Sequence, residues 1–480
     1  ILLASSRPIR MIAYADYVKG GVIGWLSNLF EIIPIRSGDG PRALLASLNT
    51  ARDALKNDEL VCIFAEGQIT RTGELLKFER GMIKILKGTN APVLPVYLDE
   101  LWGSIFSYEG GKFFWKKPKH WPYPVSINFG TLMPPENVTD ADAVRNAVLN
   151  LKDDSAARRK ERSMIPAIRF TRQCRLAWSR TKVADSAGTD LTGGKLLTGS
   201  LAFHKLLTTS VLPPDEQMVG LLLPPSAGGA IANFAVSLAG KVSVNLNYTL
   251  SDDVVNFCIK EAGIKRIITS RKFMEKKPMK LDAELVYMED LKEQIGGMAK
   301  AAAFAKAKLM PLGMLSKSLG LTTVKPDEMM TIIFTSGSTG EPKGVMLSHN
   351  NINSNLDAAD ELLKLKNSDV LLGVLPFFHS FGYKGGWLAC LIHGATALPH
   401  GVFSEEAVLE RVQNEKITVL PGPPAIYQSL LTFEGRSKFD TSSLRLAVTG
   451  AAPTPVELVH RMRDELGFES VIKAYGLTES

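Results

Sequence analysis

The stretch TIIFTSGSTGEPKGVM, residues 331–346, joins an apolar run to a loop rich in glycine and hydroxyl residues and then to Lys343. The apolar run predicts a buried strand. Glycines let main-chain N–H groups approach an anion, hydroxyls add donors, and the lysine adds a positive charge. We therefore expect a phosphate-binding loop made of Thr335, Ser336, Gly337, Ser338, Thr339, Gly340, Lys343 and Gly344.

The spacing of this loop differs from that of the P-loop NTPases. Their motif, G-x-x-x-x-G-K-[ST], places serine or threonine directly after the lysine. Here Lys343 follows Pro342 and precedes Gly344. Taken alone, a loop of this composition is equally compatible with a flexible turn that binds nothing. The other motifs of the chain therefore decide between a phosphate-binding loop and a flexible turn.

Four further motifs follow the loop: LPFFHSFGY at 375–383, LPGPPAIY at 420–427, VTGAAP at 448–453 and YGLTES at 475–480. In this order, together with the loop, they resemble the adenylate-forming (AMP-binding) acyl ligases over residues 189–480. The resemblance implies that a carboxylate attacks the α-phosphorus of ATP, giving an acyl-adenylate and pyrophosphate. Such a site stabilises charge on the departing oxygens and needs no unusual nucleophile.

The resemblance also implies residue roles. Lys343 and the loop would hold the β- and γ-phosphates, Thr478 would contact the α-phosphate, and Glu479 would bind Mg²⁺, a hard cation suited to a carboxylate. The adenine would lie along Gly450, Ala451 and Ala452 and stack on Tyr475. His379 lies where the family places a gate to the acyl tunnel; without the family, a packed, hydrogen-bonded histidine is an equally good interpretation.

A second signal is LVCIFAEGQITRTG at 60–73, which reads as a strand followed by a turn. It resembles the F-P-E-G-x-R-[ST] block of glycerolipid acyltransferases. It is most similar to the F-P-E-G-R-I-T-x-T-G version of bacterial bifunctional 2-acylglycerophosphoethanolamine acyltransferase/acyl-ACP synthetases, with which Ile69 agrees. Two positions depart from that version: Ala65 replaces proline and Gln68 replaces arginine.

The acyltransferase resemblance implies substrate contacts at Arg36, Glu66, Gly67 and Arg71. Arg36 ends IIPIR, residues 32–36, which with APVLPVYL at 91–98 fits neighbouring blocks; it either binds a glycerophosphate head group or closes a strand at the surface. The family's H-x-x-x-x-D pair is not found before Glu66, since the first histidine is His120. The chain starts at Ile1 and stops at Ser480 inside a motif, so we expect a fragment with little turnover of its own.

Composition excludes several classes of protein. The chain has 480 residues, 45% of them hydrophobic, with no apolar run of ~18 residues such as a membrane span needs. Its four cysteines, Cys62, Cys174, Cys258 and Cys390, have no C-x-x-C spacing, which favours a reducing cytoplasm over zinc or disulfides. The basic residues behind the net charge of +7 are spread along the chain or gathered in two segments. This distribution gives little support to nucleic-acid binding.

The two basic segments have other interpretations. Residues 151–188 fit a basic linker or a solvated helix face. Residues 112–123, KFFWKKPKHWPY, mix lysines with aromatics, which suits either the headgroup layer of an anionic membrane or a hairpin packed on its own domain.

We expect an α/β protein with three parts: a glycerolipid-acyltransferase-like α/β domain at 1–150, the linker at 151–188, and the large N-terminal α/β region of an adenylate-forming ligase at 189–480. The expected function is phospholipid remodelling at the cytoplasmic face of the inner membrane. ATP and Mg²⁺ would activate a fatty acid, acyl carrier protein would accept it, and a lysophospholipid or glycerophosphate would receive an acyl group. The alternatives are a long-chain ligase for coenzyme A fused to another acyltransferase, and a non-catalytic nucleotide- or lipid-binding scaffold.

Overall fold

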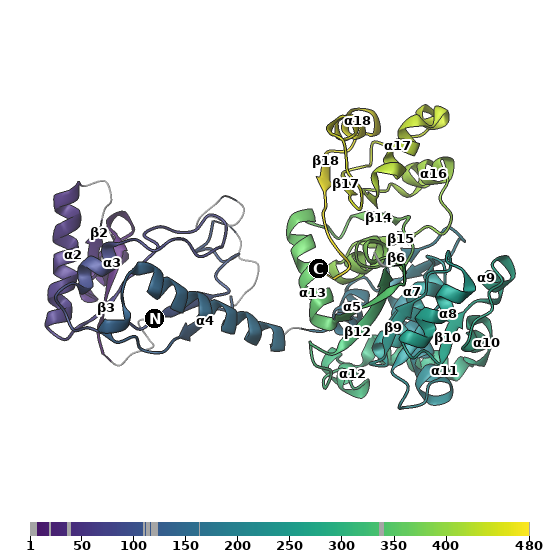
Figure 1. The fold of residues 1–480 in the computed structure, drawn as a ribbon, viewed down its shortest axis with the longest axis horizontal. Helices are drawn as coiled ribbons and strands as arrows, with labels where there is room; N and C mark the ends of the chain where they lie inside the picture. Colours follow the sequence, from purple (N-terminus) through teal and green to yellow (C-terminus); the bar gives the residue numbers. More distant parts are fainter. Residues whose placement is uncertain are drawn as a thin grey trace. The chain divides into compact units, whose positions relative to one another are not determined.

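Two α/β units divide the chain at Arg162 in the computed structural model (Figure 1). The first unit is Ile1–Arg162 and the second is Ser163–Ser480. The structure describes residues 7–18, 21–35, 40–108, 111, 116, 123–162, 164–335 and 340–479. Each hydrophobic cluster draws its residues from one unit only, so each unit has its own core.

The first unit contains a parallel sheet in the order β2-β1-β3, made of β2 (Ile33–Ile35), β1 (Ile9–Tyr14) and β3 (Leu60–Cys62). Helix α2 (Pro41–Lys56) packs on β2 and β3 and also contacts α3 (Gly81–Leu86). Helix α1 (Gly21–Leu29) lies between β1 and β2 in the chain. A proline at the first turn favours the start of α2, and the buried Leu48, Ala51 and Ala54 recur at helical spacing. These residues form one core with Ile12 and Ile33.

An antiparallel pair, β4 (Val96–Asp99) and β5 (Ser126–Phe129), completes the described part of the first unit together with α4 (Ala141–Arg162). Asp99 is buried, pairs with Arg159 of α4 and accepts a hydrogen bond from Ser155 at 2.6 Å. A buried carboxylate needs such partners, so these contacts fix α4 on the strand pair.

The second unit contains two sheets. The six-stranded sheet has the order β11 (Glu284–Tyr287), β10 (Arg266–Thr269), β8 (Met218–Leu221), β9 (Val242–Asn245), β12 (Met329–Thr335) and β13 (Lys343–Ser348). The seven-stranded sheet has the order β18 (Ser470–Lys473), β17 (Leu446–Thr449), β16 (Val419–Gly422), β14 (Val370–Gly373), β15 (Thr396–Pro399), β6 (Thr181–Ala184) and β7 (Asp190–Thr192). Only the β12–β13 and β6–β7 pairs are antiparallel among the described strands of this unit.

Helices surround these sheets (Figure 1). They are α5 (Pro166–Leu176), α6 (Gly193–Leu206), α7 (Ala227–Leu238), α8 (Asp252–Glu261), α9 (Arg271–Lys276), α10 (Met288–Gln294), α11 (Gly297–Leu309), α12 (Leu312–Ser318), α13 (His349–Leu363), α14 (Ser380–Tyr383), α15 (Ala389–His393), α16 (Glu405–Glu415), α17 (Pro424–Thr432) and α18 (Val456–Leu466). One cluster joins both sheets, with Ile333 and Leu347 from the first and Val419 and Leu446 from the second. The strands that flank the predicted phosphate loop therefore share one core with strands that lead to the later motifs.

The structure differs from the expected linker at 151–188. Helix α4 continues to Arg162 because its last turns meet the buried Asp99, and α5 and β6 belong to the second unit. Phe170 and Cys174 of α5 are fully buried. Several basic residues of the segment thus lie on packed helices; Arg159, for example, pairs with Asp99.

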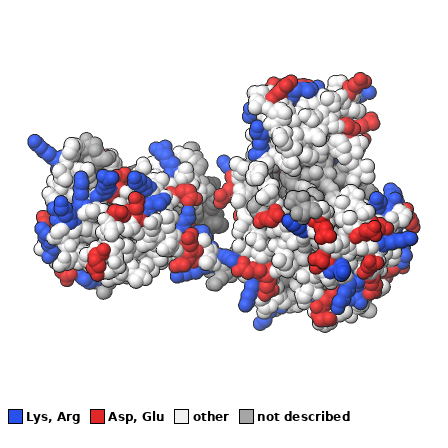
Figure 2. Space-filling view, viewed as in Figure 1, with Lys and Arg blue, Asp and Glu red and all other residues white. Residues whose placement is uncertain are grey.

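On the face drawn in Figure 2, basic and acidic side chains are interspersed over the second unit. No helix among the described residues is long and apolar enough to cross a membrane. The four cysteines are free, and three of them, Cys174, Cys258 and Cys390, are buried.

Acid is expected to destabilise the second unit through His349, the first residue of α13. Its side chain is buried, and desolvation lowers its pKa to about 4, although Glu328 opposes this. An unfolded histidine has a pKa of about 6.5, so the unfolded chain binds the proton more tightly. The contribution of His349 to the free energy of unfolding is therefore complete above about pH 6.5. This residue alone should lower the free energy of unfolding by about 2 kcal/mol by pH 5. His204, whose pKa is likewise lowered to about 4, has the same sign.

Urea unfolding above about pH 6.5 and at pH 5 measures this loss of stability. His349→Gln should reduce the pH dependence, whereas His460→Gln, at an exposed position, should leave it unchanged. Equal pH dependence in wild type and His349→Gln would remove His349 as its source.

Candidate functional site

The predicted phosphate loop joins the antiparallel strands β12 and β13. Thr335 and Lys343 face each other in the register of this hairpin, and the Thr335 hydroxyl lies 3.5 Å from the Lys343 carbonyl oxygen. Lys343 is exposed, so its ammonium is available to a ligand. Gly340 has φ +98°, a conformation that favours glycine. Ser336, Gly337, Ser338 and Thr339 lie outside the described residues.

Gly344 lets the hairpin close tightly. A Cβ at this position would lie 3.2 Å from Ile332 Cγ2 and from Phe334 Cε1. Because Gly344 has no Cβ, β13 lies close against the side chains of β12. This packing holds Lys343 at the start of β13, directly after the loop.

Two neighbouring strands carry the later motifs. Strand β17 ends at Thr449 and leads into Gly450, and β18 ends at Lys473 and leads into Ala474. The Ala474 N–H donates to the Thr449 carbonyl at 2.7 Å, and a Cβ on Gly450 would lie 2.6 Å from the Ala474 carbonyl oxygen. The VTGAAP and YGLTES segments are therefore held together by main-chain contact.

The residues that follow these strands are open to a ligand. Ala451, at φ +65°, adopts a conformation unusual for a residue with a side chain, and it is exposed like Ala452. Such strain often marks functional positions. Tyr475 is 93% exposed, so its ring is available for stacking. Thr478 is half-buried and Glu479 is exposed.

The LPFFHSFGY motif packs against the six-stranded sheet. The ring of Phe378 meets that of Tyr248, just beyond β9, at 5.0 Å edge to face. His379 is the N-cap residue of α14, and its Nδ1 accepts a hydrogen bond from the Phe381 N–H at 3.2 Å. Desolvation lowers the pKa of His379, which favours the neutral ring that accepts this bond. The side chain remains exposed, so both interpretations of His379 stay open.

The LPGPPAIY motif has a packing role. Tyr427 is fully buried, and its hydroxyl donates to the Leu420 carbonyl at 2.5 Å and lies 3.3 Å from the Val448 carbonyl. This side chain connects β16 to β17 and thereby positions the strand that ends at Gly450.

In the first unit, the acyltransferase-like turn is braced by its own residues. The Glu66 carboxylate accepts a hydrogen bond from the Leu76 N–H at 2.7 Å, and Gly67 has φ +65°. The Arg71 guanidinium lies 5.0 Å from the centre of the Tyr108 ring, a cation–π contact. Glu66 thus shapes the turn, whereas Arg71 stays exposed. Arg36 and His120 lie outside the described residues, as does most of 112–123.

Some contacts that support these sites had no local signal in the sequence. Arg145 of α4 donates to the Leu75 and Leu76 carbonyls at 3.2 and 2.9 Å, bracing the turn from 69 residues away. Tyr248, which packs on Phe378, likewise lies outside every motif. Only the tertiary fold brings these residues to their partners.

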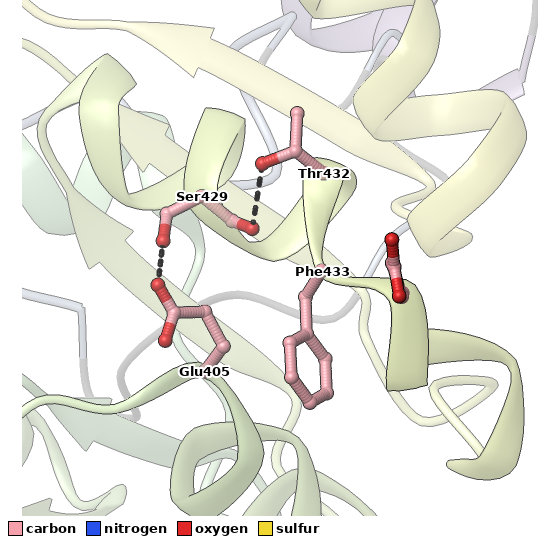
Figure 3. Close-up of a pocket in the computed structure, with 5 residues that line it drawn as sticks. Glu405, Ser429, Thr432 and Phe433 are labelled. Carbon is pink, nitrogen blue, oxygen red and sulfur yellow. Dashed lines mark hydrogen bonds between the residues drawn. The ribbon is translucent and has the colours of Figure 1, made fainter.

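A surface pocket of ≈430 Å³ lies apart from the predicted residues, between the start of α16 and the end of α17. Figure 3 shows the Glu405 carboxylate directed at the Ser429 hydroxyl, with the Phe433 ring beside them. The hydrogen bond from Ser429 lowers the pKa of Glu405. None of the predicted site residues lines this pocket.

The arrangement of the motifs on the two sheets agrees with a family model described as AMP-binding enzyme, which matches residues 170–480. The chain belongs to this family. Residues 1–99 match a second model, Acyltransferase. The predicted fold class, an acyltransferase domain followed by the large region of an adenylate-forming ligase, is confirmed.

Curated relatives agree with the family. A 3-[(3aS,4S,7aS)-7a-methyl-1,5-dioxo-octahydro-1H-inden-4-yl]propanoyl:CoA ligase of Rhodococcus jostii (strain RHA1) is 49% identical over 157 residues, which is 33% of this chain and 30% of the relative. The acyl-CoA ligase SID4 of Ajellomyces capsulatus is 28% identical over 262 residues, 52% of this chain and 44% of the relative. The chain thus spans less than half the length of these relatives.

Solved structures share the fold. The N-terminal domain of FACL13 from Mycobacterium tuberculosis superposes with a TM-score of 0.56 at 20% identity, covering 66% of this chain and 77% of that one. The anthranilate CoA ligase AuaEII gives a TM-score of 0.54 at 19% identity, covering 66% and 59%.

Proposed function

We propose that the second unit activates a fatty acid with ATP, forming an acyl-adenylate and pyrophosphate. The observation that carries this proposal is the pairing of Thr335 with Lys343 in a hairpin that shares one core with the strands leading to Gly450 and Tyr475. The groups that we propose to bind the phosphates and the adenine ring thereby stand on one hydrophobic core.

In this reaction the carboxylate oxygen attacks the α-phosphorus, and the bond to the bridging oxygen of pyrophosphate breaks. Lys343 stabilises the negative charge that grows on the leaving group, and Thr478 orients the α-phosphate. Thr335 adds a hydroxyl donor from the opposite strand. Tyr475 stacks on the adenine, while Gly450, Ala451 and Ala452 present small groups to its edge and face.

Glu479 suits Mg²⁺ as one ligand among several. Its carboxylate is exposed, and the described residues contain no cluster of three or more acidic, histidine or cysteine side chains able to hold a metal alone. Mg²⁺ is commonly bound by one or two carboxylates with waters and substrate phosphates. When bound, it would neutralise charge on the phosphates.

For the later steps we propose a thiol acceptor and an acyltransferase reaction. The acyl-adenylate would pass to acyl carrier protein, and the first unit would transfer an acyl group to a lysophospholipid or glycerophosphate at the cytoplasmic membrane surface. Coupling both reactions in one chain shortens the path of a reactive thioester. The names of the relatives, which are CoA ligases, favour coenzyme A as the alternative acceptor.

A non-catalytic scaffold is the remaining alternative. Ala65 and Gln68 keep it open for the first unit, because both depart from the acyltransferase block. In the second unit Lys343, Thr478 and Glu479 are all present, which argues against it.

Fatty-acid-dependent exchange of labelled pyrophosphate into ATP tests the first step. We expect exchange with long-chain fatty acids and none without a carboxylic acid. Thioester formation is then compared with acyl carrier protein and coenzyme A, and acyl transfer with lysophospholipid and glycerophosphate. Nucleotide binding without exchange for any carboxylic acid would support the scaffold instead.

A further inference from the structure

Helix α11 carries an apolar stripe on the side that faces solvent, at the edge of the second unit (Figure 1). The helix packs on α6, and its Ala303 and Ala307 are buried. On the opposite side, four exposed apolar residues recur at the helical spacing i, i+4, i+7 and i+11 and form what we call the α11 stripe: Met298, Ala302, Ala305 and Leu309. A surface helix normally turns polar residues to water, so a helix that is apolar on both sides indicates a second contact.

The apolar surface continues from the stripe onto the end of α5. Met298 and Leu309 are 90% and 76% exposed, and Leu176, the last residue of α5, is 71% exposed. Arg175 donates to the Lys306 carbonyl of α11 at 3.1 Å, which holds Leu176 beside α11. Single exposed apolar side chains are common on proteins, but several on adjoining helices mark an interaction surface.

The helices around the stripe carry positive charges only. None of α5, α6, α11 and α12 contains Asp or Glu, and α6 packs on both α5 and α11 while α12 packs on α5. Residues 295–326 also contain no Asp or Glu, but they contain five lysines, all exposed: Lys300, Lys306, Lys308, Lys317 and Lys325. Among the residues that the structure describes, no ion pair joins these lysines to a carboxylate. The surface is therefore complementary to an anionic partner.

Two lysines flank the stripe. Lys306 directly follows Ala305, and the next lysine, Lys308, directly precedes the last stripe residue. At about 100° of rotation per residue, these two lysines lie on opposite sides of the stripe. The Lys308 ammonium lies 5.4 Å from the centre of the Trp178 ring, just beyond α5, a cation–π contact. Because a lysine can lay its methylene groups on an apolar surface while its ammonium stays among polar groups, the stripe and its flanks match the boundary between an apolar layer and an anionic one.

We propose that α11 docks the second unit on an anionic lipid surface. The α11 stripe enters the boundary between headgroups and acyl chains, while Lys306 and Lys308 contact lipid phosphates. With 13 residues the helix is too short to span a bilayer, so it lies along the surface. None of the residues assigned to adenylation belongs to this surface, so the proposal stands without the proposed function.

Two features favour a lipid surface over a protein partner. The long side chains of the stripe, Met298 and Leu309, stand near the two ends of the helix, roughly 16 Å apart, with only alanines of the stripe between them. Such widely spaced, flexible side chains suit a deformable layer better than a single pocket. Lysine is also depleted in protein–protein interfaces, whereas an anionic membrane attracts it.

Sedimentation of the whole chain with vesicles tests the proposal. We expect binding to vesicles of equal parts phosphatidylglycerol and phosphatidylcholine, and much weaker binding to phosphatidylcholine alone. A triple variant, Lys300→Gln with Lys306→Gln and Lys308→Gln, should weaken binding to the anionic vesicles roughly 100-fold, at roughly 5-fold for each lysine. Added salt should weaken binding of the wild type, because it screens the same charges.

The apolar stripe has a variant of its own. Met298→Gln together with Leu309→Gln should weaken binding to the same vesicles roughly 10-fold or more, while the salt dependence remains. The control for lost charge is a second triple variant at exposed lysines of α8 and the end of α9, Lys260→Gln with Lys276→Gln and Lys277→Gln. Leu362→Gln, at an exposed leucine of α13, controls for lost apolar surface. All of these positions are exposed, so each variant should fold like the wild type.

The expected result is weaker vesicle binding by both α11 variants and unchanged binding by both controls. Equal binding by the wild type and either α11 variant would overturn the proposal, as would an equal loss in an α11 variant and its control. A dimer that Leu309→Gln dissociates, or binding to acyl carrier protein but not to vesicles, would also overturn it. Either of these outcomes would assign the stripe to a second copy of the chain or to the carrier protein.

Discussion

Gly450→Ala should lower fatty-acid-dependent ATP–pyrophosphate exchange by roughly 100-fold, the loss expected when reacting groups move by about 1 Å. The added Cβ would lie 2.6 Å from the Ala474 carbonyl oxygen, closer than real Cβ atoms approach. Either β17 or β18 must then shift, and with it the segment that carries Tyr475 and Thr478. The expected change in stability is smaller, about 1–3 kcal/mol, because the rest of the sheet can adapt.

Gly313→Ala is the matched control, since a Cβ there would meet nothing within 4 Å. It lies in α12, where alanine is the better helix former, so exchange and stability should be maintained. Unfolding by urea separates a loss of fold from a displaced site. If Gly450→Ala exchanged pyrophosphate at the wild-type rate, the close spacing of Gly450 and Ala474 would not matter for catalysis.

Lys343→Ala is expected to slow the same exchange by roughly 10- to 100-fold. The lost contact is a charge-assisted one of ~1.5–3 kcal/mol that is strongest in the transition state. The side chain is exposed at the start of β13, so the fold should persist.

Lys300→Ala, at an exposed lysine of α11, controls for the general loss of a positive charge. Exchange is measured at saturating ATP and again at low ATP, which separates a loss of binding from a slower chemical step. Exchange by Lys343→Ala equal to that of Lys300→Ala would exclude Lys343 from the mechanism.

The sequence predicted the fold best where a strand and its loop follow each other directly. The apolar run that starts at Thr331 belongs to strand β12, which ends at Thr335 where the predicted loop begins. The strand expected at the start of 60–73 is β3 (Leu60–Cys62), and the turn with Glu66 and Gly67 follows it. In each case the pattern of neighbouring residues carries the information.

The contacts made by residues 151–188 could not be predicted, because they involve residues that are distant in the sequence. Arg158 and Arg159 look like solvated charges in the sequence, yet Arg159 pairs with Asp99, 60 residues away. The turn at Glu66 likewise depends on Arg145 of α4, which donates to the Leu75 and Leu76 carbonyls. Such contacts become visible only after the chain has folded.

The side chains of the two motif turns were also not predictable in detail. Glu66 accepts a hydrogen bond from its own turn, and Tyr427 ties two strands together. Both positions belong to recognisable motifs, but a motif does not distinguish a residue that touches substrate from one that shapes the loop. The predicted ligand contacts at Thr478, Glu479, Arg36 and Arg71 remain predictions.

The strand β13 after the phosphate loop has an electrostatic consequence. Where a helix starts directly after such a loop, its aligned peptide dipoles provide about half a positive charge that is part of the backbone. Here a strand follows, α13 begins only at His349, and the fixed positive charge next to the loop is the ammonium of Lys343. A backbone dipole persists as long as the helix does, whereas a side-chain charge can be removed by one substitution or by acetylation while the sheet stays intact.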